Sequence, residues 1–488
     1  MQRRQFLILS GSSLASVLLS KCATPQTQSN ASSMSTVFKS QEGRLDVDLD
    51  MSSSLFSLGG EQGNLLSYNQ QIPGPRLEAR PGDQVRIRAT NRLSAPTNLH
   101  YHGLHISPKG SADNIFLKLS PGESYIYEFT IPKNHYSTTA YYHPHFHGYV
   151  AQQVFGGLGG IFVVRGALDE IPEIKQAKEE FIFLKDFDVN VATERSQPFQ
   201  RMQMMGREGS TVTVNGRVNP ELSISAGGLL RLRFVNASTS RFYNLQLEGH
   251  SFYLIATDAG ATSSPIELSE LLLSPGERAE VLVKGNAQSG HYRLLNLPYQ
   301  RGGMGMMGRG MIGRGRMGHH GMRRGQPNRE TSSQTLATLT YSGEVEPLSL
   351  PQKLIPVEEL PEPQTKRQFT LNHGMIPGRG MQFLINGQVF DSQRTDTRAF
   401  LDTVEEWEIS NTGVMDHPFH LHTNRFQVVS RNGQPLPYRT WKDTVLVPRG
   451  ETVRIRIPFR DFVGKTVYHC HILDHEDLGM MGTIALQA

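Results

Sequence analysis

Cysteine is nearly absent from this chain, whose 488 residues contain only Cys22 and Cys470, at opposite ends. Two distant cysteines exclude a disulfide framework, a zinc ribbon and an iron–sulfur cluster held by cysteines. Charged residues make up only 19%, against about 25% in typical soluble proteins. Beyond the N-terminal segment, no apolar run is long enough to span a membrane. The mature protein is therefore expected to have no transmembrane segment.

A large basic surface is also lacking. The formal net charge of +4 comes from two segments without acids: residues 301–324 hold six Arg, and residues 1–22 hold Arg3, Arg4 and Lys21. Without these nine positive charges, the rest of the chain has a net charge of −5. No nucleic-acid partner is expected, because such partners are bound by a basic surface.

The N-terminus has the features of an export signal. Arg3 and Arg4 precede a run of apolar and small residues that ends near Ser20 and is too short to span a bilayer. This pattern is typical of a bacterial twin-arginine signal, so we expect the twin-arginine export machinery as a partner and the periplasm as the destination. The residues before Cys22 are slightly similar to a lipoprotein cleavage box, but Lys21 is out of pattern, so lipid anchoring at Cys22 is not expected.

The local pattern is that of strands and turns. The 47 Gly and 27 Pro indicate many turns and argue against a coiled coil or a helical repeat. Short runs that alternate apolar and polar residues, such as Val85–Arg88, Leu230–Phe234 and Val453–Ile457, predict half-buried strands. The chain is therefore expected to be all-β.

The same order of features occurs in three successive units. Each unit has an Asn turn (Asn69, Asn215, Asn386) and, further on, a Gly-Glu pair before a strand (Gly122, Gly276, Gly450). Each has the size of one Greek-key β-sandwich, and internal repetition favours separate domains. The predicted boundaries are a signal and disordered linker at 1–40, a first domain at 41–168, a second domain at 169–346 with a Met-rich insertion at 301–324, a Pro-rich linker at 347–366, and a third domain at 367–488.

Twelve of the 18 histidines lie in four short clusters in the first and third units, and the middle unit has no such cluster. Four pairs have i, i+2 spacing, which in a strand places both side chains on one face about 6.6 Å apart. These pairs are His100/His102, His143/His145, His420/His422 and His469/His471. If the two units meet in space, eight imidazoles can converge on several metal ions.

Cys470 is flanked by two of these histidines, so it points to the opposite side of its strand. There it can meet His417, His475 and Met480. One thiolate, two imidazoles and a weak thioether form the ligand set of a blue-copper electron-transfer site. Zinc fits less well, because structural zinc sites are usually closed tetrahedra rich in cysteine. The sequence therefore favours copper on both faces of this strand.

The four histidine segments resemble the copper-binding motifs of the multicopper oxidases, especially the bacterial laccases and cuprous oxidases, from about residue 45 to the C-terminus. The resemblance implies three cupredoxin-like Greek-key β-sandwich domains and four copper ions: one type 1, one type 2 and two type 3. It implies these ligands: His417, Cys470, His475 and axial Met480 for type 1; His100 and His420 for type 2; and His102, His143, His145, His422, His469 and His471 for type 3. Tyr101 stands where the family more often has Trp, which affects packing rather than ligation.

Two clustered histidines, His105 and His147, are left without a metal role. His145 and His147 also have i, i+2 spacing, but the internal repeat aligns Tyr142–His145 with Tyr468–His471. His147 is therefore expected to lie behind the ligands or in the core.

Acidic residues are expected near the copper cluster, because reduction of dioxygen to water consumes protons. Asp113 and Glu476 resemble the acids that the family has at these places, with Glu476 in the position of a proton relay. Asp416 and Asp443 are near the type 1 ligands in the sequence and are expected to contact the substrate.

Residues 301–324 contain nine Gly, six Arg and six Met, a composition that cannot form a packed core. Methionine suits Cu(I), so we expect this segment to capture copper or to gate the substrate. The candidate substrate residues are Met304, Met306, Met307 and Met311, together with Met415, which matches a Met at the substrate-copper site of the cuprous oxidases. The segment departs from the family pattern because it contains no Asp or Glu.

The sequence therefore predicts an exported multicopper oxidase that takes single electrons from Cu(I) or a phenolic reductant and reduces dioxygen to water, in copper tolerance. The alternative is a periplasmic copper-sequestering protein, but storage does not require a Cys flanked by two cluster histidines. A third hypothesis is a structural protein of the cell envelope with the same fold. The resemblance implies that relatives of that kind lose the ligands, whereas this chain retains them.

Overall fold

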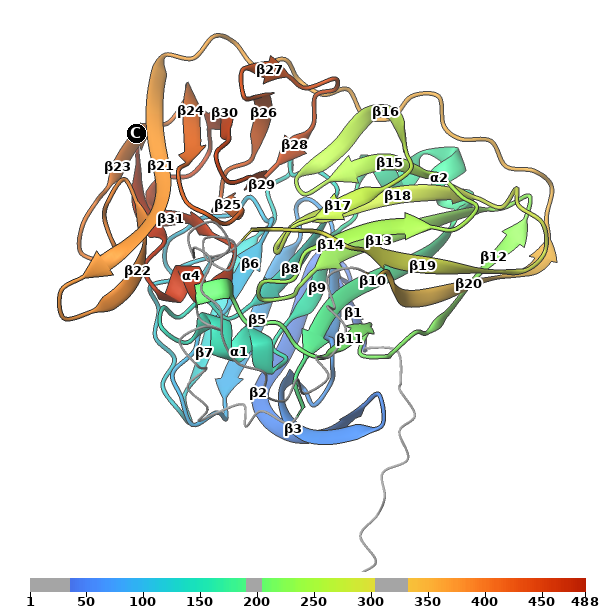
Figure 1. The fold of residues 1–488 in the computed structure, drawn as a ribbon, viewed down its shortest axis with the longest axis horizontal. Helices are drawn as coiled ribbons and strands as arrows, with labels where there is room; N and C mark the ends of the chain where they lie inside the picture. Colours follow the sequence, from blue (N-terminus) through green and yellow to red (C-terminus); the bar gives the residue numbers. More distant parts are fainter. Residues whose placement is uncertain (1–35, 190–203, 303–331) are drawn as a thin grey trace, which may run out of the picture. The chain divides into compact units, whose positions relative to one another are not determined.

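The computed structural model describes residues 36–189, 204–302 and 332–488, which fold mainly into strands (Figure 1). These strands form six sheets, two in each of three consecutive stretches of the chain. The described helices are all short: α1 Val150–Gly156, the 3-10 helix η1 Ala167–Glu170, α2 Pro172–Gln176 and α4 Leu473–Asp477. None of them is long and apolar enough to cross a membrane. The prediction of an all-β chain is confirmed.

The first domain has a five-stranded and a four-stranded sheet. The five-stranded sheet has the order β1-β4-β9-β8-β6, with β1 Val37–Lys39, β4 Gly74–Ala79, β9 Gly160–Val164, β8 Thr138–His143 and β6 His100–His102. The other has the order β3-β2-β5-β7, with β3 Glu61–Tyr68, β2 Arg44–Leu58, β5 Gln84–Asn91 and β7 Ser124–Thr130. Buried and less buried residues alternate along β5, as the sequence predicts, because one face packs into the core between the sheets.

The second domain has a six-stranded and a five-stranded sheet. The larger sheet has the order β11-β10-β13-β18-β15-β16, with β11 Thr211–Val214, β10 Lys178–Phe187, β13 Leu229–Asn236, β18 Arg278–Lys284, β15 Phe252–Thr257 and β16 Gly260–Leu268. The smaller sheet has the order β12-β20-β19-β14-β17, with β12 Glu221–Ala226, β20 Gln334–Glu344, β19 His291–Leu297, β14 Tyr243–Leu247 and β17 Leu271–Leu273. Apolar residues from both sheets share one core.

The third domain repeats this architecture. Its larger sheet has the order β22-β21-β24-β30-β26-β27, and β28 also pairs with β26; the strands are β22 Gly380–Ile385, β21 Thr365–Ile376, β24 Thr403–Asn411, β30 Thr452–Phe459, β26 Phe426–Arg431, β27 Gln434–Pro435 and β28 Trp441–Lys442. Its smaller sheet has the order β23-β32-β31-β25-β29, with β23 Thr397–Phe400, β32 Met481–Gln487, β31 Gly464–Cys470, β25 His417–Leu421 and β29 Thr444–Val447. The core between these sheets includes Cys470 and Met480.

The sequence repeat corresponds to a structural repeat. The three turn asparagines have positive φ angles of 52°, 53° and 53° (Asn69, Asn215, Asn386). The three turn glycines that precede Glu have φ angles of 83°, 84° and 73° (Gly122, Gly276, Gly450). In each domain an early strand pairs parallel to a later one: β2 with β5, β10 with β13, and β21 with β24. Three β-sandwich domains of the same design thus follow one another in the chain.

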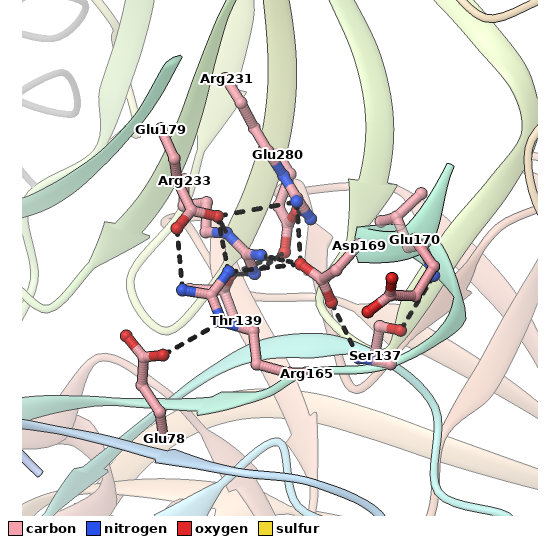
Figure 2. Close-up of polar contacts among 12 residues, drawn as sticks. Glu78, Ser137, Thr139, Arg165, Asp169, Glu170, Glu179, Arg231, Arg233 and Glu280 are labelled. Atoms are coloured by element: carbon pink, nitrogen blue, oxygen red, sulfur yellow. Dashed lines mark hydrogen bonds and ion pairs between the residues drawn. The ribbon is translucent and has the colours of Figure 1, made fainter. Parts of the chain in front are cut away.

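One strand differs from the half-buried pattern predicted for it. Every residue of β13 is buried, including Arg231 and Arg233 in its alternating sequence. The two arginines point into an ion network, shown in Figure 2, with three acids of the second domain: Asp169, Glu179 and Glu280. Arg165 of the first domain pairs with Glu179 and with Glu78, and so joins a first-domain acid to this network. Arg233 donates to Glu179 Oε1 at 2.7 Å and to Glu280 Oε1 at 2.9 Å. The polar face of this strand is therefore an interface between domains rather than a solvated surface.

Candidate metal centre

The eight i, i+2 histidines lie on, or directly after, four strands from two domains. In the first domain β6 and β8 are antiparallel neighbours, with His100 opposite His143. In the third domain β25 and β31 are antiparallel neighbours, with His420 opposite His469. Each domain therefore presents a matching pair of strands that carry histidines, as the repeat predicts.

The histidines of the two domains stack on one another. The rings of His100 and His422 are stacked with their centroids 3.9 Å apart, and those of His102 and His420 are stacked at 3.8 Å. These contacts join residues more than 300 positions apart in the sequence. The predicted meeting of the first and third domains at the histidines is present in the structure.

The remaining histidines close the cluster. His469 Nε2 lies 3.1 Å from His145 Nε2 and 3.0 Å from His422 Nε2. The ring centroids of His143 and His471 are 5.7 Å apart. All eight side chains are buried, and together they form what we term the eight-histidine cluster.

Many ring nitrogens of this cluster lack partners. Seven buried nitrogens have no hydrogen-bond partner among the described residues: His100 Nε2, His102 Nδ1, His143 Nε2, His145 Nδ1, His420 Nε2, His422 Nδ1 and His471 Nδ1. Buried polar atoms of proteins normally have partners. Burial also holds the pKa of these imidazoles below the ordinary value for seven of the eight, and lowers that of His143 to about 3. Neutral imidazoles with free nitrogens are the form that binds metal ions.

A second group, the cysteine cluster, lies on the other side of β31. Cys470 Sγ is 3.4 Å from His417 Nδ1 and 3.8 Å from His475 Nδ1, and these two nitrogens are 3.3 Å apart. Met480 is fully buried in the same core, and its carbonyl accepts a hydrogen bond of 3.0 Å from the Cys470 amide. Burial raises the pKa of the Cys470 thiol and lowers the pKa of His417 to about 3. A thiol, two neutral imidazoles and a nearby thioether fit a soft metal ion such as copper.

Neighbouring groups orient the cysteine cluster. His475 Nε2 donates to the Met204 carbonyl at 3.1 Å, which leaves its Nδ1 to face Cys470. The Phe383 ring stacks on His475 with centroids 3.7 Å apart, and the Ile472 amide donates to Cys470 Sγ at 3.4 Å. The ring orientation of His475 is therefore set by both a hydrogen bond and a stacking contact.

The two clusters are joined by covalent bonds at the end of β31. His469 lies opposite His420, whereas Cys470 lies opposite Phe419 in the apolar core. Successive side chains of a strand point to opposite faces. Cys470 therefore places its sulfur in one cluster, while its two neighbours in the chain place their imidazoles in the other.

Two predicted acids contact the eight-histidine cluster. Asp113 Oδ1 is 2.8 Å from His100 Nδ1 and accepts a hydrogen bond of 3.0 Å from the Tyr101 amide. Glu476 lies between His469 Nδ1, 3.2 Å from Oε2, and His145 Nδ1, 3.5 Å from Oε1. Burial raises the pKa of Asp113 to about 7, and burial together with Asp477 raises the pKa of Glu476 well above 4.5. Both groups can therefore hold a proton beside the cluster near neutral pH.

Asp443 is not where the sequence places it. It was expected at the type 1 ligands in contact with substrate, but it is buried and its Oδ1 lies 3.1 Å from His102 Nε2. The register of β25 and β29 explains the difference: Val447 lies opposite His417, but Thr444 lies opposite His420. Asp443 therefore stands at the end of this strand pair that faces the eight-histidine cluster.

Asp416 and Met415 lie close to the cysteine cluster in the chain, but both are buried. Tyr299 donates its hydroxyl to Asp416 Oδ2 at 2.7 Å, and the Arg449 amide donates to Oδ1 at 2.9 Å. Met415 is only 1% exposed, and its backbone pairs with Gly302. Contact of these two side chains with substrate stays a prediction.

The other candidates are placed as follows. His105 Nδ1 donates to the Thr423 carbonyl at 2.7 Å, and its Nε2 lies 2.8 Å from Asp461 Oδ2, so His105 has no nitrogen free for a metal. His147 packs against Phe390 with centroids 4.6 Å apart. Met304, Met306, Met307 and Met311, like the export signal and Cys22, lie outside the described residues.

Sequence reasoning missed four residues at the eight-histidine cluster. Tyr141 lies with its hydroxyl 2.9 Å from His471 Nε2, and Thr444 Oγ1 is 3.1 Å from His420 Nδ1. Gly276 approaches His471 so closely that a Cβ would meet its ring at 2.8 Å, and Arg278 forms an ion pair with Asp443 at 2.6 Å. Only Gly276 had a signal in the sequence, because it belongs to the repeated turn.

The fold and both clusters define a copper protein built from cupredoxin-like domains. Models of the multicopper oxidase family match residues 51–168, 179–308 and 360–487. The chain belongs to the multicopper oxidase family.

Three similar proteins illustrate the range of this family. "Multicopper oxidase mco" of Staphylococcus haemolyticus is 29% identical over 437 residues, covering 86% of this chain and 83% of that protein. "Cell division protein FtsP" of Xenorhabdus nematophila is 30% identical, covering 86% of this chain and 84% of that protein. The structure of a Campylobacter jejuni multicopper oxidase, described as a metallo-oxidase, has a TM-score of 0.79 at 29% identity, covering 93% of this chain and 95% of that chain.

Proposed function

We propose that this protein is an exported oxidase that couples the one-electron oxidation of Cu(I) or phenols to the four-electron reduction of dioxygen, in copper tolerance. Four electrons and four protons convert one dioxygen to two water molecules. The observation that carries the proposal is the position of Cys470, with its sulfur in one cluster and its chain neighbours in the other. An electron accepted at the cysteine cluster has a covalent route of a few bonds to the eight-histidine cluster.

We assign the ligands as the resemblance implies. The type 1 copper would be held by His417, Cys470, His475 and Met480; the type 2 copper by His100 and His420; and the type 3 pair by His102, His143, His145, His422, His469 and His471. The buried nitrogens without partners and the low pKa of these imidazoles support the assignment. Bound copper would supply the one-electron redox steps.

The chain's own acids would supply protons. Glu476 touches two histidines, and burial favours its protonated form. Asp113 touches His100 and has a pKa of about 7, so it can both take up and release a proton near neutral pH. We place both acids in the delivery of protons to dioxygen.

Export rests on the N-terminal sequence. Arg3 and Arg4 before an apolar run favour twin-arginine export to the periplasm. A fusion of residues 1–40 to a reporter that is active only after export would test this, with Arg3 and Arg4 both changed to Lys as the control. Equal export of both fusions would contradict a twin-arginine route.

Oxygen consumption tests the enzymatic proposal directly. The copper-loaded protein is expected to consume dioxygen when supplied with Cu(I) or a phenol, with about four reductant molecules oxidised per dioxygen. The Cys470→Ser variant serves as the control that removes the entry sulfur. A blue protein that binds copper but consumes no dioxygen with either reductant would refute the oxidase function.

The substrate class can be tested through the Met-rich segment. Deletion of residues 303–324 leaves Gly302 and its pairing with Met415 in place. If the segment presents Cu(I), the deletion is expected to slow Cu(I) oxidation and leave phenol oxidation unchanged. If the deletion has the same effect on the rate of Cu(I) oxidation as on the rate of phenol oxidation, the segment is a spacer.

A second candidate function is a structural role in cell division, because a relative named FtsP is 30% identical. The retained histidines and Cys470 argue against a role without metal. Sequestration of copper without turnover is a third candidate function. Copper content and turnover separate the three. A structural protein binds little copper, a sequestering protein binds copper without turnover, and the oxidase does both.

A further inference from the structure

The second domain carries no histidine cluster, but it contains Arg278, a buried arginine with all of its side-chain donors in hydrogen bonds. It lies in β18 of the second domain and is only 1% exposed. A guanidinium has five N–H donors. In Arg278 all five are used: they donate to the carbonyls of Thr139, Gly276 and Asp258 and to both carboxylate oxygens of Asp443. Its position and orientation are therefore fully determined by three backbone segments.

The carboxylate that Arg278 holds contacts a histidine of the cluster. Arg278 donates to Asp443 Oδ1 at 2.7 Å and to Oδ2 at 2.6 Å. The same Oδ1 lies 3.1 Å from His102 Nε2 and accepts a hydrogen bond of 2.8 Å from the Thr444 hydroxyl. The charge of the buried carboxylate is thus compensated, and its orientation relative to His102 is set by a bidentate pair.

A second histidine of the cluster, His420, is held by Thr444 and by the backbone of Asp443. Thr444 Oγ1 is 3.1 Å from His420 Nδ1, and the Asp443 carbonyl is 2.9 Å from that nitrogen. This leaves His102 Nδ1 and His420 Nε2 as the nitrogens without partners, on rings stacked 3.8 Å apart. The contacts therefore determine which nitrogen of each ring is free for a metal ion.

We infer that Arg278 is a positioning residue through which the second domain orients His102 and His420, by way of Asp443 and Thr444, for metal binding and dioxygen reduction. The inference rests on the proposed ligand roles of these two histidines. It gives the middle domain a part in the chemistry although none of the proposed ligands lies among its described residues. Lysine at this position keeps the charge, but its three donors cannot hold three carbonyls and two carboxylate oxygens.

Arg233 provides a matched control. It is also buried in the second domain, and it also contacts Thr139, to whose side-chain hydroxyl it donates at 3.0 Å. Its acidic partners are Glu179, Glu280 and Asp169 in the ion network of Figure 2. None of the hydrogen bonds described for Arg233 reaches a histidine. Arg233→Lys therefore disturbs a comparable buried ion pair without touching the metal ligands.

The experiment compares Arg278→Lys and Arg233→Lys in the full-length protein. Three quantities are measured: the copper bound per chain, the electron paramagnetic resonance spectrum of the copper in the eight-histidine cluster, and the blue absorption of the copper in the cysteine cluster. Arg278→Lys is expected to weaken copper binding by the eight-histidine cluster roughly 10- to 100-fold and to alter that spectrum, with the blue absorption retained. Arg233→Lys is expected to leave all three unchanged.

Unchanged copper content and spectrum in Arg278→Lys, or equal changes in both variants, would overturn the inference. If Arg278→Lys does not fold, the isosteric Thr444→Val variant tests the same path, and an unaltered spectrum there has the same meaning. These measurements do not depend on turnover. Absence of oxygen consumption by the wild-type protein would refute the oxidase function and leave the comparison of copper binding intact.

Discussion

The turn glycine Gly276 offers a test of how closely the second domain is fitted to the eight-histidine cluster. Its φ is 84°, and a Cβ there would lie 2.8 Å from Cγ and Cδ2 of His471. Gly122 occupies the same turn of the first domain with φ 83°, and a Cβ there would meet nothing within 4 Å. Substitution of each by Ala therefore imposes the same backbone strain, but only Gly276→Ala adds a clash with a proposed copper ligand.

The magnitudes follow from this comparison. A left-handed backbone costs an alanine about 1–2 kcal/mol, and we expect this loss of stability in both variants. Carbon atoms in favourable contact are about 3.5 Å apart, so in Gly276→Ala the turn or the His471 ring has to move by roughly 0.7 Å. Because a displacement of about 1 Å at a reacting centre can cost 100-fold in rate, we expect Gly276→Ala to lower dioxygen reduction roughly 10- to 100-fold.

The assay combines stability and activity. Urea unfolding of the metal-free proteins measures the backbone cost, and oxygen consumption with copper content measures the effect on the cluster. Gly122→Ala is expected to lose stability and retain wild-type turnover per bound copper. The reasoning would be refuted by a Gly276→Ala variant with wild-type turnover, or by a Gly122→Ala variant that loses as much activity.

Three further predictions concern the acids, the cysteine and pH. Glu476→Gln is expected to slow dioxygen reduction but keep the blue absorption, because the amide fits the site and cannot deliver a proton; unchanged turnover would remove Glu476 from the relay. Cys470→Ser is expected to abolish the blue absorption while the eight-histidine cluster still binds copper, which absorption and metal analysis would show; persistent blue colour would contradict the ligand assignment. The metal-free protein is expected to lose stability as the pH falls from about 7 to about 5, since histidines of the unfolded chain bind protons near pH 6.5 whereas the buried ones, with lowered pKa, do not. Among the described residues, four buried acids with a raised pKa act in the opposite direction: Asp113 and Asp477, each with a pKa of about 7, together with Glu476 and Asp258. They are fewer than the histidines, so urea unfolding that shows higher stability at about pH 5 would contradict this prediction.

Much of the ligand arrangement could be predicted because it depends on local geometry. Side chains at i and i+2 share one face of a strand whatever the rest of the fold does, and Cys470 between two histidines must point away from them. The internal repeat then selected His143 and His145 over His147. The alternating pattern likewise predicted strands such as β5, where one face meets the core and the other meets solvent.

The residues that were missed depend on contacts between domains. Arg231 and Arg233 lie in a run predicted to be a half-buried strand, and no prediction was made for Arg278, but the packing of the second domain buries all three. Asp443 was misplaced because nearness to ligands in the sequence does not tell which end of a strand pair a residue occupies. Its position follows from the register of β25 and β29, which joins segments more than 20 residues apart.

The division of the proposed ligands between the first and third domains also determines when each cluster can form during synthesis of the chain. A chain under synthesis has the first four residues of the eight-histidine cluster at residue 145, and the other four follow only from His420 to His471. The cysteine cluster becomes complete only with His475 and Met480. A chain whose synthesis has not reached His471 therefore lacks part of the eight-histidine cluster, and a chain that has not reached Met480 lacks part of the cysteine cluster.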